Sequence, residues 1–458
     1  MFNSLGRMQP ILQSETATDS ESATLLREAA QCTTRGEIGK AEALARQVLA
    51  RDPRHAGAME ELGRIAHRTG NKRAATDWLR KATATEPNNF QLHNKLAFCL
   101  IQLGEREQAL RAIMRALEIK PDDPDTIVNK GTFDLQEGRL NEALAAFRQA
   151  LEINPLHQNA RFNMMVALED VPPWHFPMMN DVPRNAAYDE AIRRIVPGHS
   201  VLDIGTGSGL LAMMAARAGA RWVATCERVP WIAAKAAEVI AANGLSDRIK
   251  VIAKRSTDLQ IGSDLKEPAE VLVSEVFGTM VLNEHVIPTI EDARARLLKP
   301  SAVVIPNVAR ARVYLAGGAA LESRLFVDRA VGFTLAPFND FMSPRIWFDA
   351  HHLPHDVLSE DVEVFRFDFT RPLARADKRV IDVTVTRPGR CFGVVQWLHL
   401  DFVEGVSYEN RPISRTTNDG WGHMLYRFSE PMELKAGDRV RLLAQHNGHY
   451  MLISNLPD

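Results

Sequence analysis

Two carboxylates, Glu275 and Glu284, flank a short loop that is rich in apolar residues and contains one glycine. The loop follows the apolar run 271–273, which has the pattern of a buried strand. Carboxylates bind a guanidinium well, because it offers five donors in a fixed fork and they accept two at a time. The spacing therefore predicts a loop that closes around a planar cation. A purely structural loop is the alternative.

A second candidate site is the glycine turn at residues 201–211, which reads as a buried strand, a tight bend and the start of a helix. Glycine allows a positive φ and lets a ligand approach the backbone closely. The helix that follows offers free N–H groups to a nucleotide-like ligand. The turn contains Asp203, Gly205, Gly207 and Gly209.

The position of the third glycine bears on which nucleotide is bound. A dinucleotide turn has the order G-x-G-x-x-G, but here Gly209 comes one position early and Leu210 stands where the glycine is expected. Glu227 follows at the predicted end of the next strand, where its carboxylate can accept both ribose hydroxyls. This combination favours S-adenosyl-L-methionine over a dinucleotide. A surface salt bridge is the alternative for Glu227.

The composition is that of a soluble globular protein of two to four domains, with 458 residues and a net charge of −2. This balance argues against binding of nucleic acid. The four cysteines are scattered, which predicts neither a disulfide framework nor a metal site and favours a reducing, cytoplasmic location. No apolar run reaches the length that spans a membrane. Residues 1–21 are expected to form a flexible tail.

The first third of the chain repeats with a period of 34 residues. The period appears in prolines at 53, 87, 121 and 155, in glycines from 36 to 138 and in alanines from 41 to 143. This pattern resembles the tetratricopeptide family, and it predicts an α-helical solenoid over residues 22–170 with four repeats and a capping helix at 158–169. A protein partner is expected on its concave surface. The alternative is that the array only stabilises or dimerises the chain.

The rest of the chain divides into two parts. Residues 171–306 alternate strand and helix patterns, which predicts a parallel doubly wound sheet with ligands at the carboxyl ends of its strands. Residues 307–458 show short alternating strands separated by turns, which predicts an antiparallel barrel or sandwich.

With these motifs in place, residues 174–306 resemble the protein arginine methyltransferase family. The strings 178–184 and 201–209 are similar to the branch that contains the seventh and ninth mammalian types. The resemblance implies a Rossmann-like S-adenosylmethionine domain followed by a β-barrel, and it identifies the two acids with the double-E loop of that family.

The resemblance also implies roles for individual residues. Arg184 would hold the methionine carboxylate of the cofactor, and Met178 or its neighbour would pack near the reacting methyl group. The glycine turn would hold the cofactor and Glu227 its ribose. Glu275 and Glu284 would clamp the substrate arginine. The alternatives are a surface cation for Arg184 and core filling for Met178.

The last third departs from the family in one place. The family carries a Thr-His-Trp loop that faces the substrate, whereas here residues 418–426 contain Trp421 and His423 in a different order. The resemblance implies a dimerisation arm inserted early in this domain, for which residues 319–355 are the candidate. The seventh and ninth types have two catalytic modules in one chain, whereas one is found here, so a homodimer is expected. The histidines at 351, 352 and 355 lack a second ligand set and are expected to be solvated.

These observations lead to one main reading, which is S-adenosylmethionine-dependent methylation of arginine in protein or peptide substrates recruited by the repeat array. Two alternatives remain. One is a methyltransferase that acts on a small guanidino compound or another small molecule. The other is a catalytically weak scaffold in which the repeats carry the function.

Overall fold

The computed structural model describes residues 11–169, 171–412 and 421–456. The chain divides into two compact units, Met1–Val171 and Pro172–Asp458. The division falls one residue beyond the boundary expected between residues 170 and 171.

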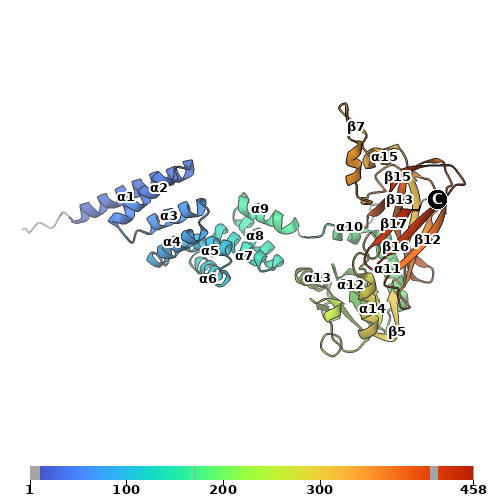
Figure 1. The fold of residues 1–458 in the computed structure, drawn as a ribbon. Coiled ribbons are helices and arrows are strands. Elements are labelled where there is room, and N and C mark those ends of the chain that lie inside the picture. The colour runs from blue at the N-terminus through green and yellow to red at the C-terminus, as the bar shows by residue number, and fades with distance from the viewer. Residues whose placement is uncertain (1–10, 170, 413–420, 457–458) are drawn as a thin grey trace, which may run out of the picture. The chain divides into compact units, whose positions relative to one another are not determined.

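The first unit is an array of helices joined by short turns (Figure 1). The turn within each helix pair carries a glycine of the 34-residue period with positive φ, and the alanines of the same period have no exposed surface, so paired helices pack closely. The predicted solenoid is thus confirmed. Its helices are α1 (Ile11–Arg35), α2 (Ile38–Arg51), α3 (Ala56–Arg68), α4 (Lys72–Thr85), α5 (Phe90–Leu103), α6 (Arg106–Ile119), α7 (Pro124–Gln136), α8 (Leu140–Ile153) and α9 (Gln158–Glu169).

The flexible tail expected over residues 1–21 is wrong for residues 11–21, which form the beginning of α1. A packed helix can propagate into polar sequence because each added residue gains one backbone hydrogen bond without a new nucleation cost. Residues 1–10 lie outside the described residues. At the other end of the array, α9 has the predicted bounds but leaves Phe162 and Met165 more than half exposed.

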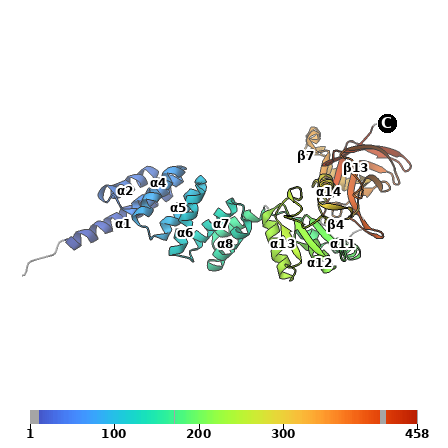
Figure 2. The same cartoon turned by 90° about the horizontal axis from the view of Figure 1, so that it is seen from below.

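The second unit begins with α10 (His175–Asn180) and α11 (Val182–Ile195) and continues into the predicted parallel sheet (Figure 2). Its five strands have the order β3-β2-β1-β4-β5 and run parallel to one another. The strands are β1 (Ser200–Ile204), β2 (Trp222–Cys226), β3 (Ile249–Ile252), β4 (Ala269–Ser274) and β5 (Leu298–Ile305), and the intervening helices are α12 (Leu210–Arg217), α13 (Pro230–Ala242) and α14 (Val286–Arg296).

Antiparallel strands follow, as predicted. One sheet contains β6 (Val308–Gly317), β9 (Arg345–Phe348), β10 (Asp356–Val357), β11 (Val362–Asp368), β13 (Gly389–Val403), β14 (Val406–Glu409) and β15 (His423–Leu434). A second sheet contains β12 (Asp377–Thr384), β16 (Arg439–His446) and β17 (Met451–Asn455). One continuous hydrophobic core joins this module to the parallel sheet.

The candidate arm is shorter than the sequence indicated. It contains α15 (Ala319–Leu325), the small hairpin β7 (Arg329–Ala330) and β8 (Phe333–Thr334), and the 3-10 segment η2 (Ala336–Phe341). β9 then pairs with β15 and returns the chain to the main sheet, so the arm does not extend to residue 355.

Two further features of the fold are the state of its cysteines and the length and polarity of its helices. Cys32, Cys99, Cys226 and Cys391 are free and buried. Among the described residues no helix is long and apolar enough to cross a membrane.

Candidate active site

The strand order places the site at one edge of the parallel sheet. β1 is central, with β2 and β3 on one side and β4 and β5 on the other, so the chain reverses its direction of winding between β1 and β4. Ligands bind at the carboxyl ends of the strands at such a switch point. Asp203 lies in β1, while Glu227 and Glu275 directly follow β2 and β4, so all three acids gather at this edge.

The glycine turn after β1 depends on its glycines for both conformation and space. Gly205, Gly207 and Gly209 all have positive φ, which other residues rarely adopt. A side-chain carbon on Gly205 would lie 3.1 Å from Val276, and one on Gly209 would lie 3.1 Å from Ile240. The backbone can therefore bend tightly here while neighbouring elements pack against it.

The acids beside this turn are held by local hydrogen bonds. Thr225 Oγ1 donates to Asp203 Oδ2 at 2.7 Å, while Glu227 accepts the backbone N–H of Val229 at 3.0 Å and, more weakly, that of Gly207 at 3.4 Å. Asp203 Oδ1 is buried and has no partner among the described residues. Burial raises the pKa of Asp203 to about 7, against the hydrogen bond from Thr225, which lowers it.

Arg184 and Glu275 form a buried ion pair. The guanidinium Nη2 lies 3.2 Å from Glu275 Oε2, and the two side chains are only 4% and 6% exposed. The rings of Tyr188 and Trp421 lie against the guanidinium, at 5.1 and 5.5 Å from its central carbon. Arg184 Nε is buried without a partner among the described residues, so the guanidinium retains a free donor.

The loop between the two glutamates is tightly built. A side-chain carbon on Gly278 would lie only 2.0 Å from Asn283 Oδ1, and Val281 is held at a φ of 66°, which is strained for a β-branched residue. Burial raises the pKa of Glu275 to about 7; Arg184 opposes this shift and Glu284 adds to it. Desolvation also raises the pKa of the more exposed Glu284, although the charge of Arg228 lowers it.

Trp421 and His423 lie in different surroundings. Trp421 Nε1 donates to the backbone oxygen of Phe277 in the glutamate loop at 2.5 Å, so this ring supports the loop directly. His423 is buried with its Nε2 2.7 Å from the backbone oxygen of Asn410, and its ring packs on His351. Burial lowers the pKa of His423 to about 4. Residues 418–420 of the same expected loop lie outside the described residues.

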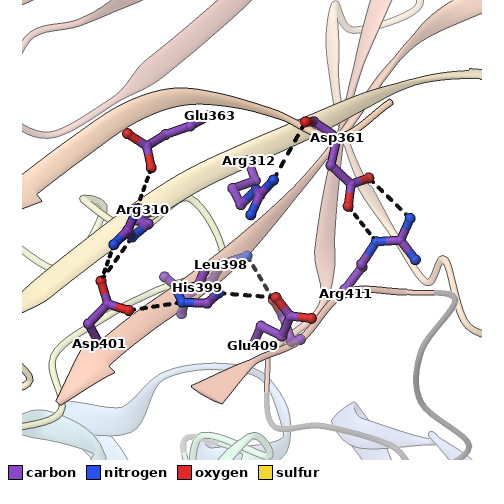
Figure 3. Close-up of polar contacts among 10 residues, drawn as sticks. Arg310, Arg312, Asp361, Glu363, Leu398, His399, Asp401, Glu409 and Arg411 are labelled. Carbon is purple, nitrogen blue, oxygen red and sulfur yellow. Dashed lines mark hydrogen bonds and ion pairs between the residues drawn. The ribbon is translucent and has the colours of Figure 1, made fainter. Parts of the chain in front are cut away.

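Asn410 connects these two residues. Its side chain accepts the N–H of Leu398 at 2.7 Å and donates to the backbone oxygen of Trp421 at 3.3 Å. The chain on either side of Asn410 is held by a network of ion pairs that includes Glu409 and Arg411 (Figure 3). The contacts of this network are Arg310 with Glu363 and Asp401, His399 with Asp401 and Glu409, and Arg411 with Asp361.

The short helix α10 lies over the glycine turn. The ring of His175 lies 4.0 Å from the position a side-chain carbon on Gly207 would occupy, and Met178 is half-buried. Burial lowers the pKa of His175, while the charge of Glu227 raises it. His175 of α10 is thus close to both the turn and Glu227, while the role expected of Met178 stays a prediction.

Metal chemistry was not expected at this site. Within residues 11–169, 171–412 and 421–456, no group of three or more His, Cys, Asp or Glu side chains is placed to hold a metal ion. His352 instead pairs with Asp349, and His355 bonds to the Tyr314 hydroxyl.

Comparison with known families agrees with this architecture. Residues 187–305 match the ribosomal protein L11 methyltransferase (PrmA) family. Residues 34–90, 74–125 and 124–155 match tetratricopeptide repeat families.

One relative decides the family. An arginine N(omega)-methyltransferase from Streptomyces achromogenes subsp. streptozoticus is 38% identical over 280 residues, which cover 60% of this chain and 77% of the relative. The chain belongs to the arginine N-methyltransferase family. A protein arginine N-methyltransferase 7 from Oryza sativa subsp. indica is 34% identical over 264 residues, covering 51% of this chain and 36% of the relative. The chain thus spans about a third of that longer protein.

A solved structure supports the same fold for this arginine methyltransferase family member. The Trypanosoma brucei PRMT1 enzyme-prozyme heterotetrameric complex with AdoHcy matches with a TM-score of 0.54 and 21% identity, covering 62% of this chain and 98% of that chain.

Several residues that support the methyltransferase site were not found from sequence. Tyr408 donates a short hydrogen bond to Asp181, and Asp181 in turn caps α11 by accepting the backbone N–H of Arg184 at 3.0 Å. Gln396 donates to the backbone oxygen of Thr279 in the glutamate loop at 3.2 Å. The Asp-x-Pro pattern at 181–183 was a usable signal, since it is typical of a helix start. The strand residues carry no comparable signal.

The glutamate pair allows a direct test. We expect Glu275→Gln and Glu284→Gln each to lower kcat by about 10²-fold or more, because each removes an oriented charge from the site. Steady-state methyl transfer measures this loss. Glu267→Gln is a matched control, because Glu267 forms an exposed pair with Arg221 and should leave turnover nearly unchanged. Near-normal turnover in both loop variants would rule out the clamp.

The pKa of Glu275 predicts a pH dependence. The carboxylate must be ionised to hold a guanidinium, and its pKa is about 7, so protonation removes the charge as the pH falls through that value. We expect kcat/KM, which reports the free enzyme, to rise from about pH 6 to about pH 8. Asp203 has a similar pKa but lies at the cofactor turn, so cofactor affinity measured over the same pH range reports its titration separately from that of Glu275. An acidic limb near the usual glutamate value of about 4.3 would contradict the assignment.

Proposed function

We propose that this chain transfers the methyl group of S-adenosylmethionine to a guanidino nitrogen of arginine. The observation that carries the proposal is the pairing of Glu275 and Glu284 across a strained loop at the carboxyl edge of the sheet. Family membership supports the same reaction. The residues around the glycine turn fit the cofactor, because Asp203 Oδ1 and Arg184 Nε supply a buried acceptor and a buried donor that are both free.

The chain's own residues act mainly by position and charge. Arginine keeps its proton at neutral pH, so its nitrogens are weak nucleophiles. Two carboxylates can draw positive charge toward the nitrogens they contact and leave another nitrogen aligned for attack. When bound, S-adenosylmethionine supplies a methyl group on a sulfonium. Trp421 and Gln396 hold the loop in place, so that little reorganisation is needed during the reaction.

The acceptor is proposed to be arginine within a protein or peptide, recruited by the repeat array. The relatives named protein arginine N-methyltransferase 7 support this choice. A small guanidino acceptor is the second candidate, because the relative that is 38% identical is named for arginine without reference to protein. The four free, buried cysteines support the further proposal of a reducing, cytoplasmic location.

A homodimer is also proposed, formed through the arm. Val331, Phe333, Phe338 and Phe341 are 97%, 71%, 69% and 82% exposed, although large apolar side chains gather there over a short stretch. An apolar cluster of this kind on an otherwise polar surface is typical of a protein interface.

The acceptor can be tested with the full chain and radiolabelled cofactor. We expect label to enter arginine-rich peptides, with a lysine-for-arginine peptide as the control that stays unlabelled, because only a guanidinium fits the fork of the two acids. Mass spectrometry of the product distinguishes monomethyl from symmetric and asymmetric dimethyl arginine. Transfer to free arginine but not to peptides would favour the small-molecule alternative. No transfer to either would favour the scaffold.

The arm can be tested separately. We expect the double variant Phe338→Asp, Phe341→Asp to sediment as a monomer, because the two aspartates would place charges in the interface, where their burial is unfavourable. Val380→Asp is the control, since Val380 is 58% exposed on β12 and lies outside the arm. A wild-type chain that sediments as a stable and fully active monomer would contradict the proposal.

A further inference from the structure

A groove of about 850 Å³ lies in the antiparallel module, and it shares no residue with the candidate active site. It forms where β9 begins, beside the paired ends of β12, β16 and β17. Its size is in the range of pockets that hold small molecules. Its lining residues include Ser343, Arg345, Lys378, Gln445, Asn447 and Tyr450.

The groove has an excess of positive charge. The guanidinium of Arg345 stacks over the ring of Tyr450 at 5.4 Å, and within the described part of the chain neither Arg345 nor Lys378 forms an ion pair with a carboxylate. The one acid in the lining, Asp377, is already bound by Arg379 Nε at 2.8 Å and by the backbone N–H of Lys378 at 2.8 Å. Two cations in the groove therefore remain without a local counter-charge.

Asn447 can add a hydrogen-bond donor to the groove. Asn447 Oδ1 already accepts the backbone N–H groups of His449 and Tyr450, at 3.0 and 2.8 Å, so its amide nitrogen is the group left to bind a ligand. His446 is buried against Phe365 and Phe367, and burial lowers its pKa, although Asp377 raises it. The ring is therefore neutral at physiological pH and does not cancel or add to the charge.

Stacking on Tyr450 restricts the orientation of the Arg345 guanidinium, and an arginine held in this way presents a planar fork. Such a fork matches the oxygens of a phosphate or a carboxylate, and a nearby ammonium adds a second charge. From these contacts we infer that the groove binds a small molecule through an oxyanion, either a phosphate or a carboxylate group. Arg345 and Lys378 hold the charge, and Asn447 donates a hydrogen bond. This site is separate from the proposed methyl transfer and does not depend on it.

The test is isothermal titration calorimetry of the full chain at low ionic strength, with inorganic pyrophosphate and citrate as separate probes. We expect saturable binding of at least one probe, and which one binds distinguishes phosphate from carboxylate. Arg345→Met and Lys378→Met should each weaken binding by about tenfold or more, as expected for the loss of one charge-assisted hydrogen bond.

Arg441→Met is the matched control. Arg441 is an exposed arginine on β16, is not part of the groove lining and loses the same charge, so this variant should bind like the wild type. Lys378 is exposed and Arg345 is partly exposed, and two independent variants guard against a folding defect in one of them. Failure of both probes to saturate, or an equal loss in the Arg441 variant, would overturn the inference.

Discussion

The site depends on keeping one ion pair, Arg184 with Glu275, almost entirely out of water. Burying two charges costs several kcal/mol per ion unless further contacts compensate, and removing one partner costs about 3–5 kcal/mol because the other charge is left alone. The compensation comes from several directions. Asp181 fixes the backbone of Arg184, and the rings of Tyr188 and Trp421 lie against its guanidinium.

The antiparallel module is therefore part of the active site and more than a second domain beside it. Tyr408 donates a hydrogen bond to Asp181, and Trp421 and Gln396 each donate one to a backbone oxygen of the glutamate loop. Asn410 donates to the backbone oxygen of Trp421. The strand that ends beside Asn410 is held in turn by the ion pairs around His399 (Figure 3). The loop can keep its strained turn because residues distant in sequence hold it in place.

These long-range contacts explain which parts could be predicted from the sequence. The repeat array and the acids at the strand ends follow from periods of 34, 3.6 and 2 residues and from the rule that ligands lie at carboxyl ends. The bond between Tyr408 and Asp181 spans 227 positions, so no local pattern contains it. The resemblance to the family's Thr-His-Trp loop groups Trp421 with His423. The fold separates them because Trp421 reaches the loop through its indole N–H, whereas the ring of His423 is directed to the backbone of Asn410.

The charges at the sheet edge indicate what the site is built to receive. Asp203, Glu275 and Glu284 all have a raised pKa because of burial, and Glu275 pairs with the buried cation Arg184. A raised pKa means that the ionised form is held at a cost, and a positively charged ligand would relieve that cost. Both a sulfonium and a guanidinium carry such a charge. Either one, bound beside these acids, would stabilise their ionised forms and so lower their pKa.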